Sequence, residues 1–340
     1  MKKNIPINRL ITGTILVAVF FSVVFGTGAC DSDKLVLKKD TRLMMDTFVT
    51  ISAEGPEKII SQAIELAFDR MQEIDTKFNI HNPKSPVFAF NNQGTPIADP
   101  EILDVIRAAL EVSRKSDGAF DITISPLIEL WGFYGDSPHV PQDSEIKECL
   151  GRIGYNNLVI KNGILEKQID NIRIDLGGIA KGYNIREGAR VLKENGVTSA
   201  LIDAGGDVYA IGRKSDRLWK VGLRNPRGKE LLGYVEIEDR AVMGSGDYER
   251  FFMNSGKRYH HIFDSKTGYP ASGIISINLF HPDPMLADAW CTAIFVSGHE
   301  KGLELVEKMP DMEAVMITVS GDRLYSSGMR DKIKQIPKKL

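Results

Sequence analysis

Apolar residues recur at two different spacings along this chain, and the wider spacing predicts four helices. In the stretch 56–78 they return every three or four positions, which is typical of an amphipathic helix. The stretch 99–118 shows the same spacing, starts with an Asp-Pro pair suited to a helix N-terminus and ends at a glycine. The same reasoning predicts helices over 181–197 and 285–298.

Alternation of apolar and polar residues predicts strands elsewhere. The predicted strand segments, several of which end in Gly-rich or Asn-Pro turns, are 46–54, 199–212, 219–226, 233–246 and 259–268. A hairpin is predicted over 314–329. No repeat, linker or low-complexity block interrupts residues 35–330. We therefore expect an α+β fold, with mixed strands and helices in one compact unit over residues 35–335.

The N-terminal residues have a different composition from the rest. Basic residues precede an uncharged run, 10–29, which predicts a secretory signal over residues 1–29. Gly28-Ala29-Cys30 resembles the end of a bacterial lipobox, in which the cysteine becomes the lipidated first residue, although Thr27 replaces the usual leucine. An uncleaved membrane anchor is the alternative, because the run is just long enough to span a bilayer.

Both alternatives predict an exported protein held at a membrane. With a lipid on Cys30, the domain would lie at the periplasmic face of the inner membrane or at another extracytoplasmic surface. Net charge is −2, and no basic stripe is present that would bind a nucleic acid backbone. Cys149 and Cys291 are too few for a disulfide framework, so free thiols are expected.

The segment IRIDLGGIAKGYN, residues 172–184, suggests a ligand site. Its first residues predict a strand ending at Asp175, and a helix is expected to start near Ile179 or Ala180. The glycines between them would let a ligand approach the main chain, and the helix N-terminus and Lys181 favour an anion such as a phosphate. Taken alone, a glycine pair at such a turn more often reflects tight packing.

A second segment offers oxygen ligands for a metal ion. Asp288 and Thr292 are four residues apart in a predicted helix, so they share one face. A carboxylate and a hydroxyl are hard ligands that suit Mg²⁺ better than zinc or iron. Taken singly, each is equally compatible with an ordinary polar group at the end of an element.

Nine segments in this order resemble the bacterial ApbE family, the FAD:protein FMN transferases or flavin-trafficking lipoproteins. They are MMDTFVTI, SPVFAFNN, GAFDITISPLIELWGF, DLGGIAKGY, IDAGGDVYAIG, WKVGLRNP, GSGDYERFF, HHIFDSKTGYP and ADAWCTA. The resemblance runs from about residue 41 to residue 330 and implies the ApbE-type, T-fold-like fold. It also implies Mg²⁺-dependent transfer of the FMN part of FAD to a Ser or Thr hydroxyl of an exported redox-complex subunit, with release of AMP.

By position in these motifs, the resemblance implies roles for individual residues. The metal would be held by Asp288, Thr292 and the main-chain carbonyl of Gly178, with Ala180 as the second choice for the carbonyl. His261 would be the general base or would orient a phosphate, whereas His260 is expected to be a surface strand residue. The implied FAD-binding residues are Met45, Phe78, Ala119, Phe120, Asp121, Asp175, Lys181 and His261.

The sequence departs from the family pattern at several positions. Asp46 replaces the glycine of the MGT segment, Gly244 replaces a threonine, and Ser265-Lys266 replaces Pro-Arg. These changes affect the expected ligand geometry more than the reaction class. Two other functions remain open: an FAD pyrophosphatase that gives FMN and AMP with water as acceptor, and a non-catalytic FAD-binding lipoprotein.

Overall fold

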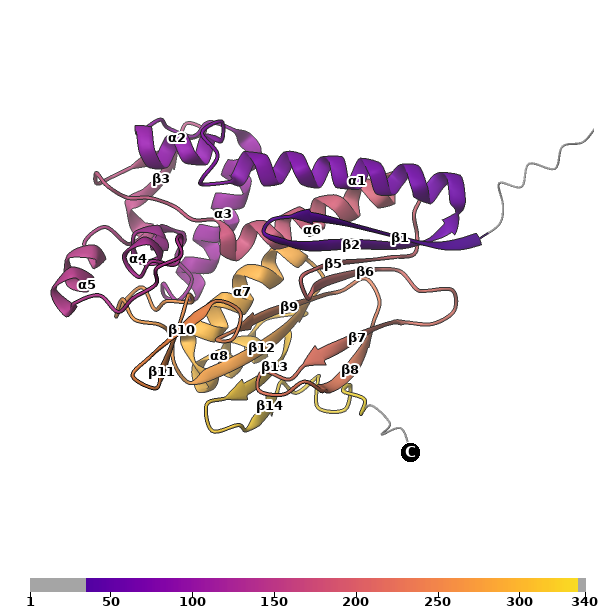
Figure 1. The fold of residues 1–340 in the computed structure, drawn as a ribbon. Helices are drawn as coiled ribbons and strands as arrows, with labels where there is room; N and C mark the ends of the chain where they lie inside the picture. Colours follow the sequence, from indigo (N-terminus) through magenta and orange to yellow (C-terminus); the bar gives the residue numbers. More distant parts are fainter. Residues whose placement is uncertain (1–34, 336–340) are drawn as a thin grey trace, which may run out of the picture.

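The structure, a computed structural model, describes residues 35–335 (Figure 1). The predicted signal segment and Cys30 therefore lie outside the described residues. Within the described part of the chain, no helix combines the length and the apolar character needed to cross a membrane.

An eight-stranded antiparallel sheet forms the centre of the fold, in the order β1-β2-β5-β6-β9-β12-β13-β14. Its strands are β1 (Leu35–Met44), β2 (Thr47–Pro56), β5 (Ala200–Ala204), β6 (Asp207–Ile211), β9 (Ala241–Gly246), β12 (Ile274–His281), β13 (Glu313–Thr318) and β14 (Arg323–Tyr325). Four of the predicted strand segments, and the predicted closing hairpin, fall on strands of this structure. The strand β1 was not predicted from its sequence.

Helices cover one face of this sheet (Figure 1). They are α1 (Glu57–Phe78), α3 (Pro100–Lys115), α6 (Gly177–Glu194), α7 (Pro284–Ser297) and α8 (His299–Lys308). The apolar stripe of α1 is buried at the predicted spacing, and Asp99 caps α3 by accepting from the backbone N–H groups of Glu101 and Ile102. Four of these helices therefore confirm the helical periodicity of the sequence.

A small antiparallel pair, β7 (Trp219–Arg224) and β8 (Leu231–Ile237), packs on the opposite face of the sheet. Burial alternates strictly along β7, because every second side chain faces the sheet. These side chains form a second core with residues of β6, β9, β12 and β13. No residue of β1 or β2 belongs to that second core within residues 35–335.

The remaining elements form a lobe beside the helices. It contains α2 (Pro86–Gln93), α4 (Ser125–Leu130), α5 (Asp143–Leu150), β3 (Leu158–Lys161), β4 (Ile164–Lys167), β10 (Phe251–Asn254), β11 (Lys257–His260) and two short 3₁₀ turns, Ile122–Ile124 and Tyr155–Asn157. Trp131 is fully buried in a third core, and its ring lies 5.5 Å from the tilted rings of Phe263 and Tyr259.

Three local predictions were wrong. The strand predicted over 259–268 ends at His260, and the following residues form turns. The approach to Asp175 is extended but not a sheet strand, because the Asn91 side chain bonds both the N–H and the C=O of Ile174 in place of a neighbouring strand. The next helix starts at Gly177, earlier than predicted. The prediction of free thiols is confirmed, since Cys149 and Cys291 are buried and unbridged.

Candidate active site

Helices α6 and α7 cross unusually closely at Gly182. A Cβ atom built on this residue would lie 2.2 Å from the carbonyl oxygen of Pro284 and 2.7 Å from the Cβ of Asp288. Any side chain at this position would therefore push the two helices apart. The backbone N–H of Gly182 donates to Asp288 Oδ2 at 2.8 Å. The close crossing thus brings the DLGGIAKG and ADAWCTA segments together.

Gly178 lies one turn earlier on α6, against Thr292. A Cβ built on Gly178 would lie 3.5 Å from Thr292 Oγ1 and 3.0 Å from Cε2 of Phe120. In a regular α-helix the N–H of Gly182 would donate to the carbonyl of Gly178. Asp288 competes for that donor. The structure therefore places a carboxylate and a hydroxyl of α7 against the first turns of α6, and both are oxygen groups of the kind that hard divalent cations prefer.

The surroundings of Asp288 favour its protonated form. Burial, and then the nearby charge of Asp207, raise the pKa of Asp288 to about 7, while Lys181 acts in the opposite direction. A cation bound to this carboxylate would reverse the balance and keep it ionised. The group is therefore poorly stabilised as an anion by the protein alone.

Lys181 and Asp207 form the charged pair of the site. Lys181 Nζ lies 2.8 Å from Asp207 Oδ2, and the other Asp207 oxygen accepts from the N–H of Gly244 at 2.7 Å. The side chain of Asp207 is only 7% exposed, whereas that of Lys181 is 34% exposed. The carboxylate of Asp207 raises the pKa of Lys181, so this lysine stays charged. A phosphate near Lys181 would meet a fixed positive charge.

Asp175 holds the start of α6. Its Oδ1 accepts from the N–H of Gly177 at 2.6 Å, and its Oδ2 accepts from the Tyr134 hydroxyl at 2.5 Å. Burial and the charge of Asp175 raise the pKa of Tyr134, so the phenol remains a donor. The backbone N–H of Asp175 also donates to Ile122. Tyr134 was not predicted as a site residue, because no spacing in the sequence links it to residue 175.

The two adjacent histidines differ in burial, and it is His260, not His261, whose side chain enters the core. His260 is buried, contacts Phe295 edge-on and places Nε2 3.0 Å from the carbonyl oxygen of Ala271. The expectation of a surface residue at 260 was therefore wrong, because β11 turns this side chain into the core.

His261 follows the end of β11 and remains partly exposed. Its Nδ1 lies 3.2 Å from the carbonyl oxygen of Arg250, and a carbonyl can only accept. We therefore assign the proton to Nδ1, which leaves Nε2 with a free lone pair. Burial lowers the pKa of His261 to about 4, and the positive charges of Arg250 and Lys181 act in the same direction. The imidazole is neutral at pH 7 and can accept a proton.

Met45 and Phe78 lie at the edge of this region on the β1–β2 turn and at the end of α1. Met45 and Asp46 both have positive φ values, 53° and 56°, and form a two-residue turn between paired Met44 and Thr47. This explains why glycine suits the position of Asp46. The Met45 N–H donates to Asp75 on α1, and the ring of Phe78 lies 5.6 Å from that of Tyr183 on α6.

The strip of Ala119, Phe120 and Asp121 approaches the site from the loop after α3. Phe120 is buried and faces Gly178, as described above, and Ala119 is partly exposed. The carboxylate of Asp121 accepts from Thr123 and from the N–H of Tyr155, so both of its oxygens are used inside the protein. Burial raises the pKa of Asp121. Its side chain therefore stabilises the loop that carries Phe120.

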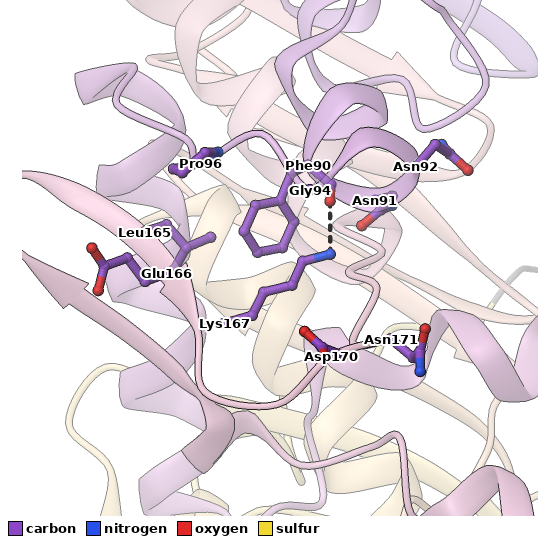
Figure 2. A pocket seen from close by; sticks show the side chains of 10 residues that line it. All are labelled: Phe90, Asn91, Asn92, Gly94, Pro96, Leu165, Glu166, Lys167, Asp170 and Asn171. Atoms are coloured by element: carbon purple, nitrogen blue, oxygen red, sulfur yellow. Dashed lines mark hydrogen bonds between the residues drawn. The ribbon is translucent and has the colours of Figure 1, made fainter.

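A cavity of about 760 Å³ lies elsewhere, between α2 and β4, and none of the predicted site residues lines it (Figure 2). Lys167 borders it, with Nζ bonded to the carbonyl oxygen of Phe90 at 2.7 Å and placed over the Phe90 ring (Figure 2). The cavity walls are polar and include Glu166, Lys167 and Asp170, but among the described residues these three form no ion pair like that of Lys181 and Asp207. Residues 35–335 also contain no group of three His, Cys, Asp or Glu side chains suited to a metal.

Comparison with solved structures identifies the fold as that of the flavin transferases. The ApbE protein of Thermotoga maritima is 32% identical, with a TM-score of 0.81 over 88% of this chain and all of that one. The flavinyl transferase ApbE of Pseudomonas stutzeri is 27% identical, with a TM-score of 0.77 over 89% of this chain and 98% of that one. The fold prediction is therefore confirmed.

The sequence comparisons give the family. The profile of the ApbE family matches residues 45–316. The FAD:protein FMN transferase of Treponema pallidum is 30% identical over 94% of this chain and 95% of its own length. The protein of the same name from Escherichia coli K12 is 29% identical over 80% of this chain. This chain belongs to the ApbE family and is an enzyme of the transferase class, which confirms the resemblance found in the motifs.

Proposed function

We propose that this protein transfers the FMN part of FAD to a Ser or Thr hydroxyl of an exported acceptor protein and releases AMP, in a reaction that depends on Mg²⁺. The observation that supports it most directly is the close crossing of α6 and α7, which places Asp288 and Thr292 against Gly182 and Gly178, next to the Lys181–Asp207 pair. Family relatives named FAD:protein FMN transferase support the coarser statement that flavin passes from FAD to a protein.

The residues between α6 and α7 fit a magnesium ion. Asp288 and Thr292 offer a carboxylate and a hydroxyl, and the carbonyl of Gly178 would be the third ligand. Glycine suits that position, because a Cβ atom there would lie only 3.0 Å from the Phe120 ring. When bound, Mg²⁺ would neutralise charge on the pyrophosphate of FAD. Lys181 would face the same phosphates, and Met45, Phe78, Phe120 and Asp175 would position the nucleotide.

His261 would take the proton from the acceptor. The hydroxyl oxygen attacks the phosphorus on the FMN side, the bond from that phosphorus to the bridging oxygen breaks, and AMP leaves with that oxygen. The hydroxyl proton passes to Nε2 of His261, which is the free nitrogen of the ring. Phosphoryl transfers of this kind depend mainly on positioning and on charge stabilisation, which these residues would provide.

The test is to incubate the protein with FAD, Mg²⁺ and an exported flavoprotein subunit, with and without chelator. In-gel flavin fluorescence reports labelling of the acceptor, and AMP is measured in the same tube. A fluorescent acceptor band that disappears with chelator is expected. AMP without a band would indicate a pyrophosphatase, and neither product would indicate a flavin carrier.

A matched pair of variants sharpens the test at the metal. Thr292→Val removes the hydroxyl and keeps the shape of the side chain, whereas Thr292→Ser keeps the hydroxyl. We expect the valine variant to lose transfer and to need more Mg²⁺, and the serine variant to retain both. Equal activity in the two variants would contradict the role of the hydroxyl.

We also propose that the protein is exported and held at the membrane by a lipid on Cys30. The support comes from the basic start, the uncharged run and the cysteine that follows it. Intact-mass measurement of the membrane-extracted protein is expected to show a chain that begins at lipidated Cys30. A mature protein that retains Met1 would refute this proposal.

A further inference from the structure

The β1–β2 hairpin has one face that is more apolar than an outer sheet face normally is. Leu43 and Phe48 are direct cross-strand partners and are 70% and 68% exposed. On the same face, nearer the start of β1, Leu35 is 70% exposed and Leu37 is 49% exposed. Antiparallel sheets usually present polar residues on the face that meets water.

The opposite face of the hairpin is fully used by the core. Val49, Ile51 and Ala53 of β2 are completely buried and belong to the main core with α1. On the outer face of the sheet, the β7–β8 pair packs against β6, β9, β12 and β13. Among residues 35–335, no residue of β1 or β2 takes part in this second core. Leu35, Leu37, Leu43 and Phe48 therefore belong neither to the main core nor to the second core, and no other part of residues 35–335 covers them.

The chain that precedes β1 limits where this face can lie. Cys30, the proposed lipidation site, is five residues before Leu35. Five residues of extended chain span at most about 18 Å. The start of β1 must therefore stay within about 18 Å of the lipid-bearing residue, whatever path the intervening residues take.

We propose that the outer face of the β1–β2 hairpin lies on the surface of the lipid bilayer, with Leu35, Leu37, Leu43 and Phe48 inserted among the headgroups. This inference rests on the proposed lipid anchor. Lys39 is exposed on the same face, between the two apolar pairs, where its ammonium group would meet headgroup phosphates. An apolar protein face on the bilayer would add buried apolar area to the attachment that the lipid provides.

The far end of the hairpin is connected to the candidate active site. The carbonyl oxygen of Phe48 accepts from the N–H of Gly205 at 3.2 Å, and Asp207, two residues later, pairs with Lys181. Ten residues of β1 extend about 33 Å. A hairpin lying on the bilayer would therefore hold the site at the membrane surface, where the parts of a membrane-bound acceptor that lie close to the bilayer can reach it.

Fluorescence quenching by the acyl chains tests the contact. Full-length Phe48→Trp protein is reconstituted into phosphatidylcholine–phosphatidylglycerol vesicles whose acyl chains are brominated, and into unbrominated vesicles. Val319→Trp is the matched control, because Val319 is also 68% exposed but follows β13 at the other end of the sheet. The native Trp131, Trp219 and Trp290 are buried and contribute the same background to both variants.

We expect brominated lipid to cause a loss of emission from Phe48→Trp and none from Val319→Trp. Equal quenching of the two variants, or none in either, would overturn the proposal. A blue shift of Phe48→Trp emission on adding acceptor protein in lipid-free detergent would also overturn it, because the face would then bind the acceptor. Equal thermal unfolding midpoints for the two variants and the wild type establish that the substitutions leave the fold intact.

The same sample separates this inference from the proposals on which it rests. Intact-mass measurement reads the lipid on Cys30, and in-gel fluorescence reads flavin transfer, both independently of quenching. Selective quenching in a chain that carries no lipid would support the contact of the hairpin with the bilayer and would contradict only the proposed lipid anchor. A lipidated, active chain without selective quenching would overturn the hairpin contact alone.

Discussion

Lys181 and Lys167 both lie in polar, partly buried regions, but the pKa of Lys181 is raised and that of Lys167 is lowered. Lys181 of α6 pairs with the Asp207 carboxylate of β6, which raises its pKa, and Asp288 of α7 is nearby. Lys167 borders the cavity beside α2 and donates to a neutral carbonyl, and burial lowers its pKa. The cavity is large, but its lysine has no carboxylate partner within hydrogen-bonding distance among the described residues.

The difference shows why volume is a poor guide to the active site of this protein. The region around Lys181 has two carboxylates, a hydroxyl and a neutral histidine, and within residues 35–335 one of the two carboxylates, Asp288, has no cation paired with it. The region around Lys167 is already satisfied by the main chain. Four predictions test this distinction, starting with the largest expected effect.

Asp288→Asn removes the carboxylate of the charged region while keeping its shape. We expect flavin transfer to fall by about 100-fold or more, since metal-held charge stabilisation contributes several kcal/mol. The thermal shift produced by Mg²⁺ should disappear as well. Asp203→Asn is the control, because Asp203 caps only the Gly206 turn and its amide oxygen can still accept from that N–H. A similar loss of flavin transfer in both variants would contradict a specific role for Asp288.

Lys181→Met leaves the buried Asp207 carboxylate without its cation. We expect the free energy of unfolding to fall by about 1–3 kcal/mol, the cost of an unpaired buried group. Urea unfolding measures this loss, and Lys181→Met combined with Asp207→Asn should recover part of it. If the double variant is no more stable than the single one, the pair does not act as described here. FAD affinity should be reduced in both variants.

The pH dependence of stability reports the neutral state of His261. Its pKa is about 4 in the folded protein, below the ordinary value of 6.5, so the unfolded chain binds more protons between these values. The contribution of His261 to stability is therefore complete above pH 6.5 and is lost as pH falls toward 4, by about 3 kcal/mol in all. Urea unfolding at several pH values measures the slope, which His261→Gln should reduce.

Buried His260 titrates in the same direction. Asp288, whose pKa is raised to about 7, titrates in the opposite direction over the same pH range, so the contribution of His261 is read from the difference between the wild type and His261→Gln. Lys181→Met should also reduce the slope slightly, because the lysine charge contributes to the low pKa of His261. A slope that His261→Gln leaves unchanged would mean that this imidazole is already charged or fully hydrated in the folded protein.

Lys167→Met is expected to have the smallest effect. It removes one hydrogen bond to the Phe90 carbonyl, which water in the cavity can replace, so the free energy of unfolding should change by no more than about 1 kcal/mol. The rate of flavin transfer should be unchanged. A strong loss of transfer with normal stability would place the cavity in the active site and end the contrast between the two lysines.

The sequence by itself predicted the helices α1, α3, α6 and α7 and most strands of the central sheet, because apolar periodicity reflects which face each element buries. It did not predict α2, α4, α5 or α8. It also determined the pairing of Asp288 with Thr292 on one helix face, since residues four apart must lie together once a helix forms. The nine ordered motifs gave the family, which the profile and the structural comparisons confirm.

Contacts between distant segments were decided only by the tertiary structure. Gly182 reads as one of several glycines in the sequence, but packing makes it the contact that brings Asp288 onto α6. Tyr134 reaches Asp175 across 41 positions, a pairing that no local pattern encodes. Likewise, alternation could not assign His260 to the core, because which face of a short strand is buried depends on the neighbour that covers it.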